Sequence, residues 1–478
     1  MSTDGQTRRS RSRKRRGRSF VLAFAGVVAA LAVGGFAGAA ATTAQGPRVT
    51  DVQVDPAAAV AASGARLIVT TSQALRDVAA DQVSIEPATP FVVDTSGRSI
   101  GVRFALPLWD DTEYTVTIAD VEGVGGGPAA TITQTFRTDP ARFHLLQRGA
   151  DQDTIFRTDL MGRQAIPVFR HAHIEDFRAT SSHLVVSVRE DSDRDSAAAG
   201  AAGGRAELIV TDLDGEDRRT LPLPGDGTVT NLQSADRGDL IGYTFTDADI
   251  SEAGGRDSML FTMSLKDPDA EPQPVEVSGT DDRVLQWRFV PGTDRVLFVG
   301  FDSTLWLTGP PEAPATPLGN AVALADVSGS TALVERPDAL VALNLTDGSE
   351  EPLVAPAEEP GQLRSVVAVP GGGTIRLYAA LDESGLPSRS VVASVDADGT
   401  TTVLSRWPST DSVIRMCVSP SGRYAATVVA PDIVDNPYDG YLLPMPERVE
   451  THIVEIATGD EIVALTGFDS SWCRVPPQ

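Results

Sequence analysis

Two histidines separated by a single residue are the best candidates in this sequence for binding a metal ion. His171 and His173 flank Ala172, and on a β-strand alternate side chains lie on one face about 7 Å apart. Two imidazoles at that spacing can reach one Zn²⁺, but a protein site for this ion needs at least a third ligand. Glu175 would lie too far along the same strand to supply it. His171 and His173 are therefore weak metal candidates, and the alternative is that they are ordinary polar residues near a loop.

A serine at position 99 matches the pattern of a nucleophile elbow, Gly97-Arg98-Ser99-Ile100-Gly101. That pattern supports catalysis only where a strand turns into a helix, and here it continues into a second apolar stretch, VRFALPL. The glycine-rich stretch 123–127 lacks the Gly-Lys-Ser/Thr that a phosphate-binding loop requires. The sequence thus predicts no catalytic residue and no cofactor.

The charge of the chain is unevenly distributed. Residues 1–19 hold eight of the 40 basic residues and one of the 65 acidic residues, which leaves 32 basic against 64 acidic residues, a net charge of −32, in the remainder. Binding to nucleic acid needs a basic surface, so this excess argues against a nucleic-acid partner. An apolar content of 41% is typical of a folded chain, and 478 residues predict two or more domains.

An uncharged apolar stretch follows the basic N-terminus. Residues 20–42 predict a transmembrane signal-anchor, because 20 or more apolar residues can cross a bilayer as a helix. The basic residues 1–19 would form a cytoplasmic tail, which places the rest of the chain outside a single-pass cell membrane. The alternative is secretion after signal cleavage at the small residues Thr42-Thr43-Ala44.

Residues 47–139 contain short apolar strands separated by turn residues, which predict an antiparallel β-sandwich. The end of this region reads Tyr114-Thr115-Val116-Thr117-Ile118, then a glycine-rich loop, then Thr135-Phe136-Arg137-Thr138. This pattern resembles bacterial Ig-like domains of the S-layer and cell-surface type. The resemblance implies a spacer or a surface-display module.

A pair of short strands joined by a polar turn recurs seven times after residue 155. The copies begin at Ile155, Leu208, Leu260, Leu305, Leu340, Val391 and His452. Their spacing averages roughly 50 residues, which is in the range of a four-stranded propeller blade.

A further strand pair precedes each copy, as in Arg415-Met416-Cys417-Val418-Ser419-Pro420-Ser421-Gly422 before AATVV. This strand, Ser-Pro-x-Gly turn and strand resembles the repeats of TolB-type and WD40-like bacterial propellers. The resemblance implies a seven-bladed β-propeller over residues 141–478. The last strand, near Trp472, would complete the first blade and close the ring.

The two cysteines fall on neighbouring inner strands of such a ring. Cys417 belongs to the last blade and Cys473 to the closing strand. In an exported chain a pair of this kind is usually bonded, so we expect a Cys417–Cys473 disulfide.

We therefore expect an all-β protein that binds or scaffolds. A membrane-anchored propeller on an Ig-like stalk would recognise an envelope protein or glycan at one mouth. The alternatives are a carbohydrate-active envelope enzyme that uses channel carboxylates, which leave no local motif, and a purely structural component.

Overall fold

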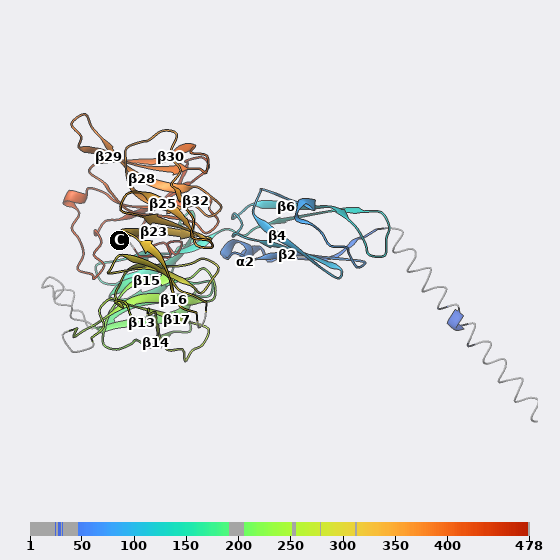
Figure 1. The fold of residues 1–478 in the computed structure, drawn as a ribbon, viewed down its shortest axis with the longest axis horizontal. Coiled ribbons are helices and arrows are strands. Elements are labelled where there is room, and N and C mark those ends of the chain that lie inside the picture. Colours follow the sequence, from blue (N-terminus) through green and yellow to red (C-terminus); the bar gives the residue numbers. More distant parts are fainter. Residues whose placement is uncertain are drawn as a thin grey trace, which may run out of the picture. The chain divides into compact units, whose positions relative to one another are not determined.

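The computed structural model describes residues 46–190, 205–250, 255–277, 279–310 and 313–476, together with five helical positions between residues 24 and 31. The chain divides into two compact units. The first comprises Met1–Ala59, Ser63–Ala105 and Thr112–Thr138, and the second comprises Val60–Ala62, Leu106–Asp111 and Asp139–Gln478. Strands dominate both units, which confirms the prediction of an all-β protein (Figure 1).

The predicted transmembrane anchor is wrong. Within the part of the chain that the structure describes, no helix has the length and apolar character needed to cross a membrane. A spanning helix needs about 20 residues, whereas only Phe24, Val27–Ala29 and Leu31 are described as helical before residue 46. The predicted single-pass localisation falls with the anchor. The rest of residues 1–45, including the alternative cleavage site at 42–44, lies outside the described residues.

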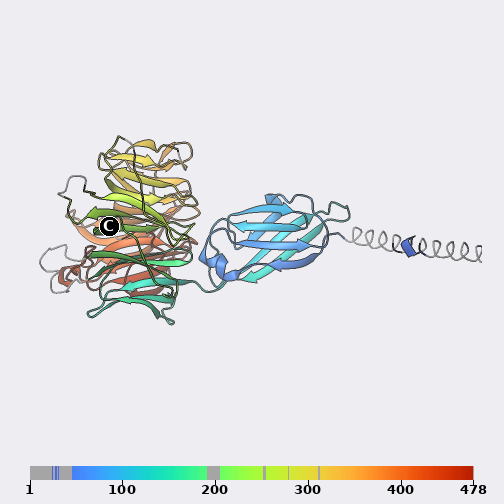
Figure 2. The same cartoon turned by 90° about the horizontal axis from the view of Figure 1, so that it is seen from below.

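The first unit contains two antiparallel sheets (Figure 2). Their strand orders are β1-β2-β5-β4 and β3-β6-β7. The aromatic rings of Phe104 and Phe136, one from each sheet, lie 6.2 Å apart between centroids, so the sheets pack on each other. The elements are β1 (Val49–Gln53), α2 (Pro56–Ala61), β2 (Arg66–Thr71), η1 (Ala80–Gln82), β3 (Val83–Glu86), β4 (Phe91–Ser96), β5 (Ser99–Phe104), β6 (Glu113–Val121) and β7 (Ala130–Arg137).

Alternation of side chains explains this packing. In β6, Tyr114, Val116 and Ile118 are buried while the residues between them are not, as expected for strands with one face toward a core. Ser99 is the first residue of β5 and pairs with β2 and β4 rather than entering a helix. Its hydroxyl lies 3.2 Å from that of Thr70.

The described part of the second unit forms six four-stranded sheets and one three-stranded sheet, all antiparallel. The seven strand pairs predicted from the repeats are the third and fourth strands of these sheets. In the three-stranded sheet, residues 467–473 take the place of the first strand, as described below. The sheets are β8 (Arg142–Gln147), β9 (Asp153–Asp159) and β10 (Ile166–His171); β11 (Ile174–Ala179), β12 (His183–Glu190), β13 (Arg205–Asp212) and β14 (Arg219–Leu221); β15 (Gly227–Ser234), β16 (Leu240–Asp247), β17 (Met259–Ser264) and β18 (Gln273–Pro274); β19 (Val284–Phe289), β20 (Val296–Gly300), β21 (Thr304–Leu307) and β22 (Thr316–Asn320); β23 (Ala323–Ser328), β24 (Thr331–Glu335), β25 (Leu340–Asn344) and β26 (Glu350–Pro352); β27 (Gln362–Ala368), β28 (Thr374–Leu381), β29 (Pro387–Val395) and β30 (Thr401–Pro408); β31 (Ser412–Val418), β32 (Tyr424–Ala430), β33 (Glu450–Glu455) and β34 (Glu461–Thr466).

Consecutive sheets contact each other through their first strands, in the order β11, β15, β19, β23, β27 and β31. These are the inner strands of a β-propeller, and the sheets are its blades (Figure 1). Apolar side chains fill the space between neighbouring blades. Trp287 of β19, which is fully buried, packs toward the preceding blade at Gly242, where an added Cβ would lie 2.5 Å from the indole. Glycine is required there by this close approach.

Every inner strand from β11 to β31 contains a β-bulge, which lies near the beginning of the strand in all but β15, where it lies between Thr230 and Gln233. A bulge adds one residue to one strand of a pair and re-aims the side chains around it. In five of these strands the residue after the extra one is polar, and we call these five the bulge positions. They are Asp176, Gln286, Asp326, Ser365 and Arg415.

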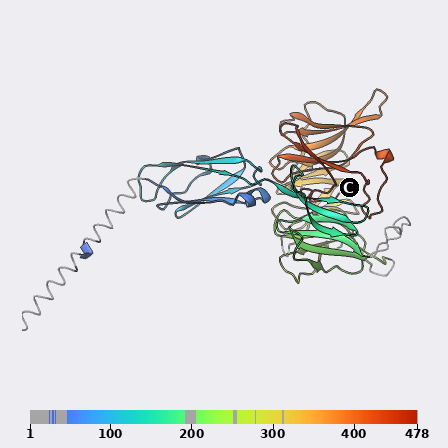
Figure 3. The ribbon, with the colours of Figure 1, turned by 180° about the vertical axis from the view of Figure 1, so that it is seen from behind.

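The ring is closed by residues 467–473, which we call the closing segment. Phe468 exchanges two backbone hydrogen bonds of 2.9 Å with Leu146 of β8, and the Ser471 amide donates to the carbonyl of His144 at 2.9 Å. The closing segment therefore lies on β8 as the inner strand of blade one. Figure 3 shows the C-terminal strands, in red, beside the first strands of this unit.

Candidate functional site

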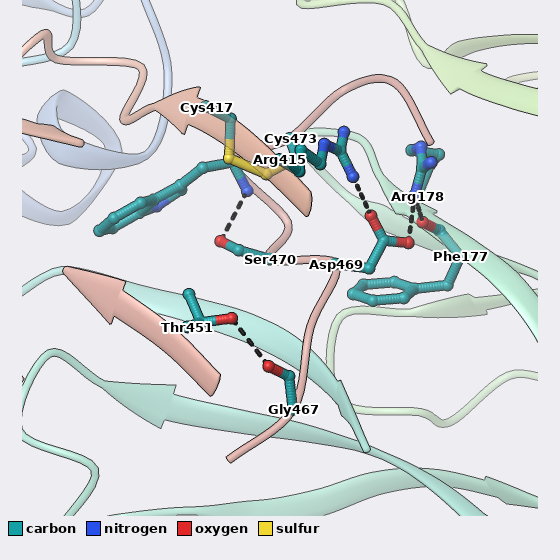
Figure 4. The surroundings of a disulfide bond; sticks show 10 residues. Phe177, Arg178, Arg415, Cys417, Thr451, Gly467, Asp469, Ser470 and Cys473 are labelled. Carbon is teal, nitrogen blue, oxygen red and sulfur yellow. Dashed lines mark hydrogen bonds and ion pairs between the residues drawn. A yellow bond between two sulfur atoms is a disulfide. The ribbon is translucent and has the colours of Figure 1, made fainter. Parts of the chain in front are cut away.

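Four charged side chains meet where the closing segment runs between the first and the last inner strands. Asp469 accepts hydrogen bonds from Arg178 at 2.6 Å and from Arg415 at 2.7 Å, one at each carboxylate oxygen (Figure 4). Asp176 lies 2.8 Å from the Arg178 guanidinium. We call Asp176, Arg178, Arg415 and Asp469 the closure cluster. The Asp469 and Arg178 side chains are 0% and 1% exposed, so water does not screen these ion pairs.

The two carboxyl groups of the closure cluster have opposite pKa shifts. Burial raises the pKa of Asp176 well above its usual value, and the neighbouring Asp469 raises it further. Burial also opposes ionisation of Asp469, but Arg178 and Arg415 outweigh it and hold the pKa of Asp469 below its usual value. Burial lowers the pKa of Arg415 to about 10. Asp176 therefore holds a proton more readily than Asp469, as expected when like charges share a buried site.

A second buried charged group lies on β19 and β23. Burial raises the pKa of Asp326, against the attraction of Arg288, and its carboxylate accepts the backbone amides of Val327 and Ala368 at 2.9 and 2.8 Å. Arg288 donates to the carbonyl of Trp287 at 2.8 Å, and burial lowers its pKa. Arg474, just after the closing segment, is close enough to Asp326 to stabilise its charge. Asp326 and Arg288 therefore form hydrogen bonds mainly with backbone atoms rather than with each other.

A cavity of about 260 Å³ opens beside the closure cluster at one end of the channel. It combines apolar walls with polar groups from the second, third and fourth blades, and Pro476, after the closing segment, also contributes to it. The lining residues are Glu175, Asp176, Ser187, Val229, Thr230, Asn231, Leu232, Leu285, Gln286, Leu442, Leu443 and Pro476. Small-ligand sites have this composition, mostly apolar with a few placed polar groups.

Three polar side chains of this lining keep hydrogen-bonding capacity within the described chain. Gln286 uses its Oε1 to accept the amide of Leu324 at 2.7 Å, and Asn231 uses its Oδ1 to accept from Gln233 at 2.9 Å. No further hydrogen bond of either side-chain amide occurs among the described residues. Ser187 is 2% exposed, and its hydroxyl makes none with the described residues either. The cavity therefore offers two amide NH₂ groups and one hydroxyl to a ligand.

The loop between β32 and β33, residues 431–449, crosses this end of the channel, and we call it the mouth loop. It includes the short helix η3 (Ile433–Asp435). Glu175 accepts the backbone amide of Leu442 at 3.0 Å, and Arg148 donates to the Asp439 carboxylate at 2.7 Å. The Arg148 guanidinium also lies 3.6 Å from the centre of the Tyr441 ring. Blades one and two therefore hold the mouth loop in place.

Glu175 is charged because of its partners. Burial opposes its ionisation, but the hydrogen bond with His173 at 2.8 Å and the nearby guanidinium of Arg189 at 2.7 Å lower its pKa below the usual value. The carboxylate of Glu175 also accepts the backbone amides of Leu442 and Leu443, so its acceptor capacity is filled. Its evident role is to fix the mouth loop.

The two predicted metal candidates lie at the connection between β10 and β11 rather than together on one strand. The Nδ1 atom of His171 accepts the backbone amide of His173 at 3.1 Å. The His173 ring instead stacks on Tyr441, with 3.9 Å between centroids, and bonds to Glu175. Glu175, judged too distant from the sequence, is thus a direct neighbour of His173. Among the described residues no group of three or more His, Cys, Asp or Glu is arranged to hold a metal ion.

Cys417 and Cys473 form a disulfide whose Cα atoms are 5.5 Å apart (Figure 4). The bond joins β31 of the last blade to the closing segment. The Cys473 amide also donates to the carbonyl of Ser470 at 2.8 Å, within the closing segment. The disulfide and the closure cluster therefore act on the same junction.

Sequence reasoning missed the closure cluster and the cavity residues. Asp469 and Arg178 are 291 positions apart, and neither belongs to a recognised motif. One signal was present in the sequence. A four-residue pattern recurs, in which the first and last residues are apolar, the second varies and the third is polar, at Ile174–Phe177, Val284–Trp287, Leu324–Val327 and Val413–Met416. This pattern departs from the period of two that a plain strand would show, and it marks the bulges.

No protein-family model matches the chain, and no curated protein matches it. Solved structures do align with it. A candidate 6-phosphogluconolactonase from Bacteroides fragilis is 12% identical over 69% of this chain and 96% of its own, with a TM-score of 0.39. The RRP9 WD40 repeats are 14% identical over 79% and 92%, with a TM-score of 0.36. Apo AztD from Citrobacter koseri is 14% identical over 76% and 95%, with a TM-score of 0.33. At such identities and TM-scores, none of these structures bears on what this chain binds or catalyses.

Proposed function

We propose that the propeller is a binding module that recognises a partner protein at the cavity end of its channel. The cavity supports this proposal most directly, because it combines apolar walls with unused hydrogen-bonding groups. Its lining comes from several blades and from the loop between β32 and β33, which is also typical of binding sites on this scaffold.

The surface around the cavity supports contact with a partner. Leu285 and Leu442 both line the cavity, yet they are 50% and 38% exposed, and Val434 and Tyr438 of the mouth loop are 90% and 56% exposed. Exposed apolar residues at a cavity, such as Leu285 and Leu442, are typical of interaction sites. The hydrogen bonds of Glu175 and Arg148 hold the mouth loop ready, which lowers the entropy cost of binding.

Hydrolysis of a glycan is less well supported than binding. A glycosidase needs two carboxyl groups facing the substrate across the scissile bond. Glu175 and Asp176 line the cavity, but Glu175 lies 2.7 Å from Arg189, and Asp176 lies 2.8 Å from Arg178. Both are already engaged in holding the fold together. Residues 47–139 we propose to be an Ig-like module, on the basis of their two packed antiparallel sheets.

The test places a photoactivatable amino acid at Leu442 in the full chain, expressed in the cells that naturally produce it. We expect one discrete crosslinked protein after irradiation. The matched control carries the same amino acid at Met161, which is 47% exposed. Met161 lies in the turn between β9 and β10, at the opposite end of the propeller from the mouth loop, because successive strands of a blade alternate in direction. The proposal fails if position 442 gives no protein adduct, or only the adducts that position 161 gives.

A further inference from the structure

We infer that the channel cavity receives a single aliphatic side chain of a polypeptide, and that Asn231 and Gln286 donate hydrogen bonds to the peptide carbonyls beside it. This inference rests on the proposed binding function and names the chemistry that the cavity selects. It draws on the size of the cavity, the character of its walls and the state of its polar groups.

The size of the cavity suits a fragment of a ligand rather than a whole one. Pockets for drug-sized molecules typically have volumes of about 300–1,000 Å³, and this one has about 260 Å³. An apolar cavity of about 150 Å³ is enough to hold one benzene ring. The apolar part of its lining comes from Val229, Leu232, Leu285, Leu442 and Leu443. One aliphatic side chain with its adjacent peptide groups fits both the volume and the walls.

The orientation of the Gln286 side-chain amide follows from its partner. The backbone amide of Leu324 can only donate, so the atom 2.7 Å from it must be the Oε1 of Gln286. This leaves the Nε2 group of Gln286 as a donor that no described residue accepts. Gln286 is partly buried and lines the cavity, so a ligand acceptor there would complete its hydrogen bonding.

The same reasoning orients Asn231. The carbonyl of Trp287 can only accept, so Gln233 presents its Nε2 there at 2.8 Å, and that same NH₂ group donates to Asn231 Oδ1 at 2.9 Å. The Nδ2 group of Asn231 is left without an acceptor among the described residues. Asn231 has a φ of 52°, in the left-handed region that asparagine tolerates better than most residues. The backbone thus holds this donor in a fixed position.

Ser187 adds a buried polar group that points to a ligand. It belongs to β12, is 2% exposed and lines the cavity. A carbonyl or an amide entering with the ligand would satisfy it.

The charges around the cavity disfavour an ionised side chain. Glu175 is neutralised by Arg189 at 2.7 Å, and Asp176 is held against Arg178 at 2.8 Å. A lysine, arginine or carboxylate entering the cavity would lose its hydration without finding an unpaired opposite charge. The cavity therefore selects an uncharged side chain.

The test titrates the full-length protein with N-acetyl-leucine N-methylamide and follows ligand relaxation by NMR. We expect saturable binding with a Kd of about 1 mM, which is reasonable for a ligand this small. The matched probes N-acetyl-serine N-methylamide and N-acetyl-lysine N-methylamide should bind at least about tenfold more weakly. Equal binding of all three probes would overturn the inference.

Two conservative variants test the amide donors. Gln286→Glu and Asn231→Asp each keep the acceptor oxygen that the fold uses and remove the NH₂ group. We expect the double variant to bind the leucine probe about tenfold more weakly, since each lost hydrogen bond is worth about 0.5–1.5 kcal/mol. Gln273→Glu, on the outermost strand of its blade, is the control and should bind like the unaltered protein. Thermal unfolding of all variants checks that the fold is retained.

The outcomes separate this inference from the proposed function. If position 442 crosslinks a protein but the leucine probe does not bind, the inference is wrong and the binding function stands. If the probe binds as well to the double variant as to Gln273→Glu, the assigned donors are wrong. If neither the crosslink nor the probe succeeds, both proposals fail.

Discussion

The junction that closes the ring and the junction between blades four and five perform the same task with different chemistry. At the closing junction, two guanidinium groups share the Asp469 carboxylate and a disulfide joins Cys417 to Cys473. Between blades four and five, Gln286 accepts the backbone amide of Leu324 at 2.7 Å, and no disulfide occurs. The closing junction therefore depends on direct ion pairs and a covalent bond. At the other junction Gln286, and the charged side chains of Arg288 and Asp326, mainly complete backbone hydrogen bonding.

Chain connectivity accounts for this difference. Blades four and five are consecutive in sequence, so a short connection between β22 and β23 keeps them together even when their side chains separate. Blade one is assembled from β8–β10 and a segment more than 300 residues later, as the hydrogen bond between His144 and Ser471 illustrates. Forming that contact closes a very long loop and costs more conformational entropy. Stronger interactions at the closing junction offset this cost.

The largest effect we expect is from Asp469→Ala. It would leave Arg178 and Arg415 buried and without their shared carboxylate, and breaking a buried pair in this way typically costs about 3–5 kcal/mol. Asp326→Asn is the counterpart between consecutive blades, where Asp326 of β23 accepts the amide of Ala368 of β27. It should cost only about 1 kcal/mol, because burial already raises the pKa of Asp326 and asparagine keeps one acceptor. Urea unfolding of both variants gives the comparison. Equal losses would show that the two junctions do not differ in this respect.

A second effect concerns the disulfide. Replacing both cysteines, Cys417→Ser with Cys473→Ser, removes a cross-link that spans 56 positions. The chain-entropy model gives roughly 4 kcal/mol for a loop of this length, and measured values are typically about 2–4 kcal/mol. We expect a loss of unfolding free energy in that range, and an unfolding rate that rises because the closing segment separates first. Hydrogen exchange of residues 467–473 would detect that separation. If β19 and β23 lost protection equally, the closing junction would not be the site of the effect.

A third and smaller effect is a pH dependence of the unfolding free energy that arises from His144, beside the closing segment. Burial lowers the pKa of His144 from 6.5 to about 4, and its Nε2 lies 2.9 Å from the carbonyl of Leu213. Between these pH values the unfolded chain binds a proton that the folded protein does not. The free energy of unfolding is therefore unaffected by titration of His144 above pH 6.5 and decreases as the pH falls from 6.5 toward 4.

The change in unfolding free energy over this window should be about 2 kcal/mol, somewhat less than the full linkage value for such a shift. His144→Gln should flatten the dependence of unfolding free energy on pH between 6.5 and 4 and leave the dependence above pH 7 unchanged. Urea unfolding at several pH values measures it. An unchanged slope in the variant would exclude His144 as the titrating group.

The sequence predicted those features of the fold that repeat. The seven strand pairs starting at Ile155 to His452 recur because each blade needs its own third and fourth strands, so periodicity alone reveals them. The residues of the closure cluster occur once each, on three different strands, and only the ring brings Asp469 to Arg178. Contacts of that kind leave no local pattern in a single sequence.

The prediction about His171 and His173 failed to anticipate the neighbours of His173 for a related reason. It assumed a continuous strand through position 175, whereas β10 ends at His171 and β11 begins at Ile174. The chain therefore turns between the two histidines and places the His173 ring against Glu175 and Tyr441. The composition of residues 20–42 suggested a membrane span, whereas no helix among the described residues is long and apolar enough to cross a membrane.

The bulges of the inner strands have a consequence for how this protein can change over time. Each bulge frees one channel-facing position from the alternation that the rest of its strand must keep to fill the core. Of the five bulge positions, Gln286 lines the cavity and lies outside the buried ion pairs, so a mutation there can alter the lining without reversing the faces of a sheet. Asp176 and Arg415 are tied to the closure cluster, so a position such as Gln286 is where natural selection can adjust recognition without weakening the ring.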